Sequence, residues 1–398
     1  MSTTATLPLL LLLGAATALT PLAIDMYLPA MPAIAEDLAS NSHRVQGTLA
    51  VYTAGFALGQ LFFGPLSDAK GRRPVLLGGM VVFMLTALLC ALASNVTTLT
   101  GLRAAQGFAG AASAVVVQAL VRDLFNREDF ARTMAYITLV MTLAPLIAPL
   151  LGGYLAHWFG WRSIFWVLAA FTAIVALACR VRLPETLPPE RRQPLHLRSI
   201  LRNYLRLFRN KTAVGFMLCG AFSFAGMFAF LTGASFMYIE LYDVSPEHVG
   251  YLFALNVMSL MLFTTLNGSW VRRLGSKTML RLALSLQLVA GLLLPLGPLF
   301  GWGLWAVVAP IMLYVGVIST IGSNTMASLL SDLPNLAGTA SSLAGTLRFS
   351  AAALGASLVA SLPDSSPLYM LVTMSGCALL SLLAYVLLCR DVAPKTLI

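Results

Sequence analysis

The polar segment that decides the fold is Gly-Pro-Leu-Ser-Asp-Ala-Lys-Gly-Arg-Arg-Pro at residues 64–74, between two long apolar stretches. Its two glycines bracket a turn too tight for ordinary side chains. Asp68 falls near the C-terminal end of the expected preceding helix, where the helix dipole disfavours a carboxylate. We therefore expect Asp68 to pair with a nearby Arg or Lys, or to face the N-terminus of another helix, and to release that contact in a second conformation. The candidate switch residues are Gly64, Asp68, Gly71, Arg72 and Arg73.

The composition predicts a membrane protein. Apolar residues make up 59% of the chain and charged residues 10%, which excludes an ordinary soluble domain. Apolar runs of about 18 residues or more recur along the whole length, and each is long enough to cross a bilayer as a helix. We count twelve such runs, the first over 7–29, the fifth over 135–156 and the last over 367–389. The predicted fold is an all-α membrane protein with twelve transmembrane helices.

The positive charges indicate the orientation. A net charge of +10 would suggest nucleic acid in a soluble chain, but 21 of the 25 Lys and Arg fall in alternate loops or at their helix ends. The opposite loops hold only Arg44 and Arg162, and Arg103 and Arg348 fall inside expected spans. The positive-inside rule places both termini and residues 181–211 in the cytoplasm. Attraction to anionic lipid accounts for most of the basic loops.

The sequence disfavours several other classes of protein. The first apolar run lacks the positively charged start of a signal peptide, so we expect a membrane helix there. The five cysteines lie in spans or at their ends without metal-binding spacing, and the four histidines are scattered over separate loops. We expect no metal, no cofactor and no enzymatic activity.

The chain divides into two halves. The longest polar segment, 181–211, is rich in Pro, Arg and Glu and separates six expected spans in 1–180 from six in 212–398. Such a linker permits the halves to move relative to one another. The segment 268–277 repeats the glycine pair of 64 and 71 at the same separation. We interpret the halves as two pseudo-symmetric six-helix bundles around a site near the membrane midplane, with chance similarity as the alternative.

Asp25 is the only acidic residue well inside an expected span, and Arg103 lies in the fourth span. A carboxylate at that depth is costly unless it is paired, hydrated or protonated, so it is a candidate for proton exchange. The two residues approach from the same side, and an Asp25–Arg103 pair would couple their charges. The alternatives are an interfacial, hydrated Asp25 and an Arg103 that extends to the interface.

The fifth span carries Pro145, Pro149, Gly152 and Gly153. Two prolines remove backbone donors and bend a helix, and small residues leave a flat face for a partner helix. Ordinary kinking is the alternative to a functional role.

Candidates for the substrate cavity are polar or aromatic residues in the spans, because such cavities are mostly apolar with a few polar groups. Packing is the alternative for each aromatic, and extension to the cytoplasmic edge is the alternative for the arginine. The candidates are Tyr27, Tyr52, Gln60, Gln106, Tyr136, Phe224, Phe228, Tyr251, Asn256 and Arg348.

These motifs resemble those of the major facilitator superfamily. The segment 64–74 resembles its loop signature between helices two and three, although Ala69 and Lys70 depart from the usual residues. The Arg103-to-Gly107 spacing resembles a motif associated with proton transfer. The stretch 144–153 resembles the antiporter signature, with alanine at two usual glycine positions. By this resemblance, the start of the eleventh span, 337–345, is a partner for Asp68.

Three stretches narrow the resemblance to the Bcr/CflA drug-resistance subfamily: 24–29, 185–192 and 337–343. The resemblance implies a multidrug exporter of the bacterial inner membrane that exchanges drug for protons by alternating access. We expect the protein to be a monomer. Bicyclomycin and related small drugs are the substrates that it implies. A proton-coupled uptake carrier for a small solute is the alternative; a membrane enzyme or a sensor would need a catalytic cluster or a signalling domain.

Overall fold

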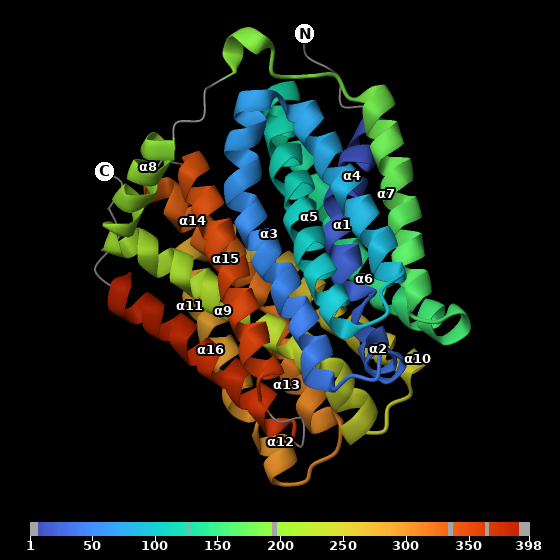
Figure 1. Ribbon diagram of the computed structural model, residues 1–398. Helices are drawn as coiled ribbons and strands as arrows, with labels where there is room; N and C mark the ends of the chain where they lie inside the picture. Colours follow the sequence, from blue (N-terminus) through green and yellow to red (C-terminus); the bar gives the residue numbers. More distant parts are fainter. Residues whose placement is uncertain (1–6, 126, 193–196, 333–336, 363–365, 390–398) are drawn as a thin grey trace. The chain divides into compact units, whose positions relative to one another are not determined.

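The computed structural model describes residues 7–125, 127–192, 197–332, 337–362 and 366–389, and every regular element in these ranges is helical (Figure 1). The helices of the first half are α1 (Leu7–Asp25), η1 (Leu28–Ala30), α2 (Met31–Asp37), α3 (Ser42–Lys70), α4 (Arg72–Ala91), α5 (Val96–Leu124), α6 (Arg127–Phe159) and α7 (Arg162–Arg182). Those that follow are η2 (Pro189–Arg191), α8 (Leu197–Phe208), α9 (Lys211–Phe236), η3 (Met237–Leu241), α10 (Pro246–Leu274), α11 (Ser276–Leu293), α12 (Leu296–Leu299), α13 (Trp305–Gly316), α14 (Ile318–Asp332), α15 (Ala337–Ala360) and α16 (Leu368–Leu388).

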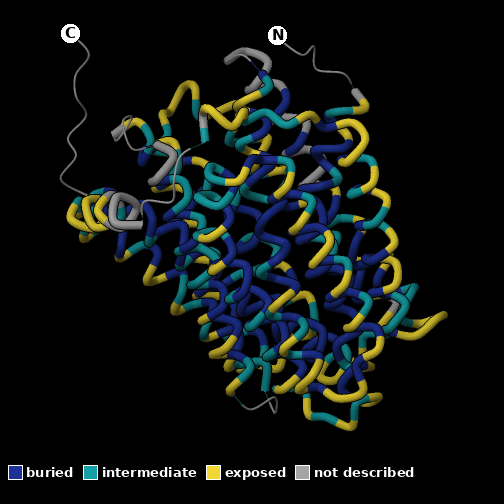
Figure 2. The backbone as a smooth tube through the Cα atoms, turned by 45° about the horizontal axis from the view of Figure 1, so that its top comes forward, coloured by how far each residue is buried: buried dark blue, intermediate teal, exposed yellow. Residues whose placement is uncertain are grey.

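The helices match the expected membrane spans. Eleven described segments are long and apolar enough to cross a bilayer, and α6 adds a shorter apolar helix over Leu143–Phe159 where the fifth span is expected. In Figure 2 the described residues are coloured by burial, and each long helix carries both buried and exposed residues. The exposed side of α7 carries Ile174, Leu177 and Val181, which are 68%, 64% and 76% exposed. Large apolar side chains at helical spacing on an outer face are typical of contact with lipid.

Contacts between residues divide the chain into two compact units. Unit 1 comprises Met1–Leu195 and Thr232–Ala254, and unit 2 comprises His196–Leu231 and Leu255–Ile398. The end of α9 and the start of α10 therefore belong to unit 1, where Ser235 Oγ donates a 2.6 Å hydrogen bond to the carbonyl oxygen of Leu28. The division that the sequence predicts, with 181–211 as a linker, stays a prediction.

In unit 1, α3 and α4 both pack along α5, α7 covers α4, and α1 lies against α6 (Figure 1).

The helices α4 and α11 begin alike in the two units. Gly71 precedes α4 with φ 104°, and Gly275 precedes α11 with φ 78°. Both glycines hold a backbone conformation that other residues rarely adopt, which is why the repeated glycines recur at these positions.

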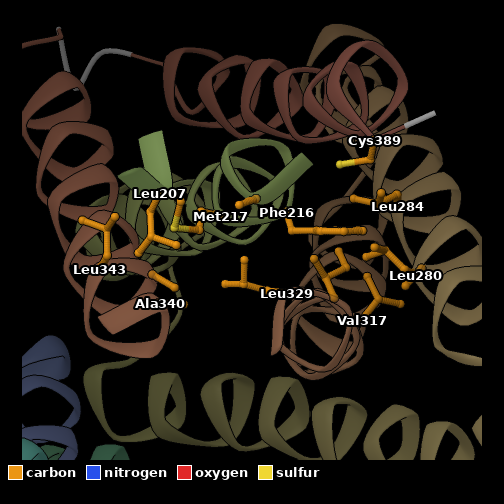
Figure 3. Packing of buried hydrophobic residues seen from close by; sticks show 14 residues of the cluster. Leu207, Phe216, Met217, Leu280, Leu284, Val317, Leu329, Ala340, Leu343 and Cys389 are labelled. Atoms are coloured by element: carbon orange, nitrogen blue, oxygen red, sulfur yellow. The ribbon is translucent and has the colours of Figure 1, made fainter. Parts of the chain in front are cut away.

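Unit 2 has its own apolar core. Its buried side chains come from α8, α9, α11, α14 and α15, from the junction before α14 and from the residue after α16. Figure 3 shows these side chains from close by. Leu207 near the end of α8 is 1% exposed and packs into the same core, so α8 is fixed to unit 2. The residues labelled in the figure are Leu207, Phe216, Met217, Leu280, Leu284, Val317, Leu329, Ala340, Leu343 and Cys389.

Candidate functional site

The turn between α3 and α4 is built around Gly71. Its φ of 104° lies in the region that favours glycine. A Cβ added at Gly71 would lie 2.6 Å from Oε2 of Glu185. The glycine predicted from its place in the 64–74 segment is therefore required both by its conformation and by a close neighbour.

Arg72 is the centre of a charge cluster in unit 1 and is only 4% exposed. Its Nη1 lies 2.6 Å from Oδ1 of Asp68 and donates a 2.7 Å hydrogen bond to Ser67 Oγ. Its Nε donates to Oδ2 of Asp123 at 3.1 Å. A nearby arginine is thus the partner of Asp68, as expected. The expected contact of Asp68 with residues 337–345 of the other unit stays a prediction.

Glu185 holds the start of α4 in place. Its Oε1 accepts the backbone N–H of Arg72 at 2.9 Å, and its Oε2 accepts that of Arg73 at 3.2 Å. The Arg73 side chain also donates to the carbonyl oxygen of Arg180. A carboxylate on the first free N–H groups of a helix satisfies them and opposes the positive end of its dipole. Glu185 therefore fastens the segment after α7 to the 64–74 turn.

Sequence reasoning missed Asp123 and Glu185 as members of this cluster. Asp123 lies near the end of α5, and Glu185 follows α7 by a few residues. Alternating spans bring these positions to the same side of the membrane as the 64–74 turn. The sequence could therefore predict that these residues lie on one side of the membrane. It could not predict which of their side chains come into contact.

Asp25 is the last residue of α1 and is 9% exposed. Among the described residues, its carboxylate makes no hydrogen bond and no ion pair. The pair expected between Asp25 and Arg103 is absent from this structure. An unpaired carboxylate in a membrane span is favourable only when it is hydrated or carries a proton.

Arg103 is fully buried and is surrounded by aromatic rings instead of a carboxylate. Its Cζ lies 4.2 Å from the ring centroid of Tyr52 and 4.6 Å from that of Tyr27. Its Nη1 donates a 2.7 Å hydrogen bond to Gln106 Oε1, whereas its Nε and Nη2 have no acceptor among the described residues. Cation–π contacts stabilise a buried guanidinium in part, and they leave two donors available for another group. Arg103 therefore does not extend to the interface.

Three of the expected cavity residues, Tyr27, Tyr52 and Gln106, form the surroundings of Arg103 and are fully buried. The Tyr27 hydroxyl shares a 2.7 Å hydrogen bond with Thr48. These three residues belong to the interior of unit 1 in this structure. Gln60 is partly buried on α3, and the side chain of Tyr136 lies outside the described residues.

The remaining cavity candidates lie on α9, α10 and α15. Phe228 packs with Phe224, their ring centroids 5.1 Å apart. Asn256 is 3% exposed, and neither of its amide atoms has a hydrogen-bond partner among the described residues. The Tyr251 hydroxyl lies 2.9 Å from that of Tyr154 in unit 1. Arg348 Cζ lies 4.7 Å from the ring centroid of Phe224.

The predicted antiporter segment lies inside the single helix α6, which contains both Pro145 and Pro149. Gly152 faces Met26: a Cβ there would meet the Met26 carbonyl oxygen and lie 2.6 Å from its Cα. A Cβ on Gly153 would have its nearest neighbour at 3.6 Å. Because Gly152 has no side chain, α6 can directly contact the backbone of Met26, the residue after Asp25.

Known proteins are similar to this chain in sequence and in fold. Residues 13–356 match the family model described as Major Facilitator Superfamily. The chain is 42% identical to the bicyclomycin resistance protein homolog of Haemophilus influenzae over 94% of both chains. It is 30% identical to multidrug resistance protein D of Escherichia coli K12, over 92% of this chain and 93% of that one. A crystal structure of a D-xylose-proton symporter shares the fold with a TM-score of 0.74 at 15% identity, covering 96% of this chain and 98% of that one. The chain, a multi-pass membrane protein, belongs to the Major Facilitator Superfamily.

Proposed function

We propose that this protein exports small drugs such as bicyclomycin across the bacterial inner membrane in exchange for protons. The observation that carries the proposal is the similarity, over nearly the whole length, to a relative named for bicyclomycin resistance. A second relative of similar length is named for multidrug resistance. We place both termini in the cytoplasm, because the alternate loops that hold most of the Lys and Arg lie on that side.

In the proposed cycle, the halves 1–180 and 212–398 alternate in exposing a central cavity to either side of the membrane. Asp25 binds a proton from the outer side and releases it to the cytoplasm. Its unpaired carboxylate supports this role, because protonation removes the cost of its charge. Arg103, with two unused donors, is the proposed partner of deprotonated Asp25 in another conformation.

The 64–74 turn is the proposed conformational switch. Asp68 is half-exposed and bonded to Arg72, whereas Arg72 is buried between Asp68 and Asp123. A surface ion pair contributes little and exchanges partners readily, whereas a buried pair is costly to break. We infer that Asp68 changes partner during the cycle while Arg72 keeps Asp123.

The proton gradient is sufficient to drive such export without another cofactor. A membrane potential of about 100 mV contributes about 2.3 kcal/mol per charge moved. Each pH unit adds about 1.4 kcal/mol per proton. With one pH unit the two contributions sum to about 3.7 kcal/mol, so one proton supports a gradient of a neutral drug of about 500-fold.

Drug susceptibility in a bacterial host that lacks its own efflux pumps tests the proposal. Expression should raise the inhibitory concentration of bicyclomycin or of another drug in a panel, and an uncoupler should abolish the increase. In everted vesicles with an imposed pH gradient, drug should move into the lumen, which corresponds to export. Movement in the opposite direction would favour the alternative, an uptake carrier for a small organic solute.

A further inference from the structure

The helix α8 lies within the segment 181–211 that the sequence predicts as a linker, and it belongs to unit 2. Leu207 is 1% exposed and lies beside Met217 in the apolar core (Figure 3). Tyr204, about one turn earlier, packs against the same core. The helix also contacts α15 (Figure 1). One face of α8 is therefore fixed to unit 2.

The end of α8 lies close to the boundary of the membrane. Arg209 and Asn210 are the only residues between α8 and α9, and the membrane span that contains α9 begins at Lys211. Asn210 Oδ1 accepts the backbone N–H of Ala213 at 3.1 Å and so caps the first turn of α9. Because two residues reach at most about 7 Å, α8 ends beside the polar surface of the bilayer. The positive-inside rule assigns this surface to the cytoplasm.

Three arginines form an exposed stripe along α8. Arg202 and Arg206 are four residues apart, and Arg209 follows three residues later, so the three share one side of the helix. The N–H of Arg209 donates to the carbonyl oxygen of Leu205 at 3.2 Å, which continues the last turn. Among the described residues, none of the three guanidinium groups makes an ion pair. Since residues 191–239 contain no Asp or Glu, the positive charge of this stripe is not neutralised by its own segment.

Two exposed apolar side chains lie beside the arginines. Leu205 is 55% exposed and Phe208 is 48% exposed. Their spacing of three residues places them together on the helix surface, between the arginine stripe and the face that packs on the core. An apolar strip next to a basic strip is typical of a helix at a bilayer surface, where the apolar side chains enter the acyl boundary and the cations meet the head groups.

We propose that α8 is a binding surface for anionic phospholipids of the cytoplasmic leaflet. The guanidinium groups of the stripe present donors in a fork that fits the phosphate oxygens of a head group. Leu205 and Phe208 contact the upper part of the acyl chains. A zwitterionic head group carries its own positive charge and is bound more weakly. Each arginine near an anionic lipid surface contributes about fivefold to this preference. The proposal concerns the membrane and does not depend on what the protein exports.

Photo-crosslinking at α8 tests the proposal. Leu205 is replaced by p-benzoylphenylalanine in the full-length protein, which is placed in nanodiscs of equal amounts of phosphatidylglycerol and phosphatidylcholine with identical acyl chains. Mass spectrometry then counts the adducts with each lipid. Adducts with phosphatidylglycerol should exceed those with phosphatidylcholine by about tenfold or more. High salt should lower this ratio, because it screens the exposed charges.

Variants of the stripe show whether its charge is the cause. Replacing all three stripe arginines by glutamine should make the two adducts equally abundant, whereas replacing them by lysine keeps the charge and should keep the preference. The matched control removes three exposed charges from the ends of α5 and α7 in unit 1 and should leave the ratio unchanged. This control combines Arg122→Gln, Arg180→Gln and Arg182→Gln.

Equal adducts in the protein with the native stripe, or an unchanged ratio in the triple glutamine variant, would overturn the proposal. If the triple variant does not fold, Arg206→Gln alone decides: the ratio should fall about fivefold, and an unchanged ratio would overturn the proposal. Crosslinks to a second copy of the chain in place of lipid would make this surface a contact between protomers, which would also overturn it.

Discussion

The carboxylate of Glu185 accepts the backbone N–H of Arg72 at 2.9 Å, across 113 residues of sequence. The same carboxylate accepts the N–H of Arg73, so the segment after α7 caps α4. We predict that Glu185→Ala lowers the stability of the purified protein by about 1–2 kcal/mol, the usual cost of losing a helix cap. Thermal unfolding in detergent measures the loss. Glu190→Ala, an exposed change in the same segment, should have no effect; equal stability of the two variants would contradict the capping role.

Gly71 has two independent reasons to be glycine, its φ of 104° and the neighbouring Glu185. We predict that Gly71→Ala destabilises the protein by about 1 kcal/mol or more, because alanine is strained at positive φ. The variant should also lose export, since the cap of α4 is displaced. Gly78→Ala is the matched control: it lies in α4 with no atom within 4 Å of the added Cβ, so it should be neutral or slightly stabilising. Unfolding midpoints and drug susceptibility are compared for the pair.

The features that local sequence could predict are those decided by composition and by contacts one helical turn apart. Apolar runs long enough to cross a bilayer predict the helices, and Asp68 and Arg72 are four residues apart, so their pair follows from spacing. Glu185 could not be assigned in this way, because its contact with Arg72 depends on how α3, α4 and α7 pack.

The surroundings of Arg103 were also beyond sequence reasoning. A buried arginine can be accommodated by a carboxylate or by aromatic faces, and helix positions alone do not decide between them. Tyr27 and Tyr52 reach its guanidinium from two other parts of the chain, whereas the carboxylate of Asp25 does not pair with it. The predicted depth of Arg103 in the fourth span is consistent with the structure, but its predicted partner is not the group found beside it.

Asp25 provides a direct test of proton coupling. We predict that Asp25→Asn abolishes drug movement driven by a pH gradient in everted vesicles, because an amide neither gains nor loses a proton in this range. The protein should still reach the membrane, since asparagine removes a costly charge. Glu36→Gln, an exposed change eleven residues further along the chain, should transport like the wild type. Transport at the full wild-type rate by Asp25→Asn under a pH gradient would rule out the assigned role.

A substitution at Arg103 can distinguish a structural role of this residue from a role in transport. Replacing a buried charge with an apolar side chain of similar volume is often neutral or stabilising. We therefore predict that Arg103→Met keeps or raises the unfolding temperature while export falls to background. Arg162→Met breaks a surface ion pair with Asp37 and should change neither quantity appreciably. Export by Arg103→Met at the wild-type level would show that the guanidinium serves only packing.

Gly152 and Gly153 are adjacent on α6 but differ in their surroundings, which makes them a matched pair. A Cβ at Gly152 would lie 2.6 Å from the Cα of Met26, the residue after Asp25, whereas a Cβ at Gly153 has its nearest neighbour at 3.6 Å. Because the obstacle at Gly152 is backbone, α6 must move away from the end of α1 to accept alanine. We predict that Gly152→Ala costs about 1–3 kcal/mol of stability, as overpacking usually does, and reduces export, whereas Gly153→Ala retains both. Unfolding temperatures and proton-driven dye movement in vesicles are measured for both variants. If Gly152→Ala behaves like Gly153→Ala, the contact between α6 and the backbone beside Asp25 has no part in transport.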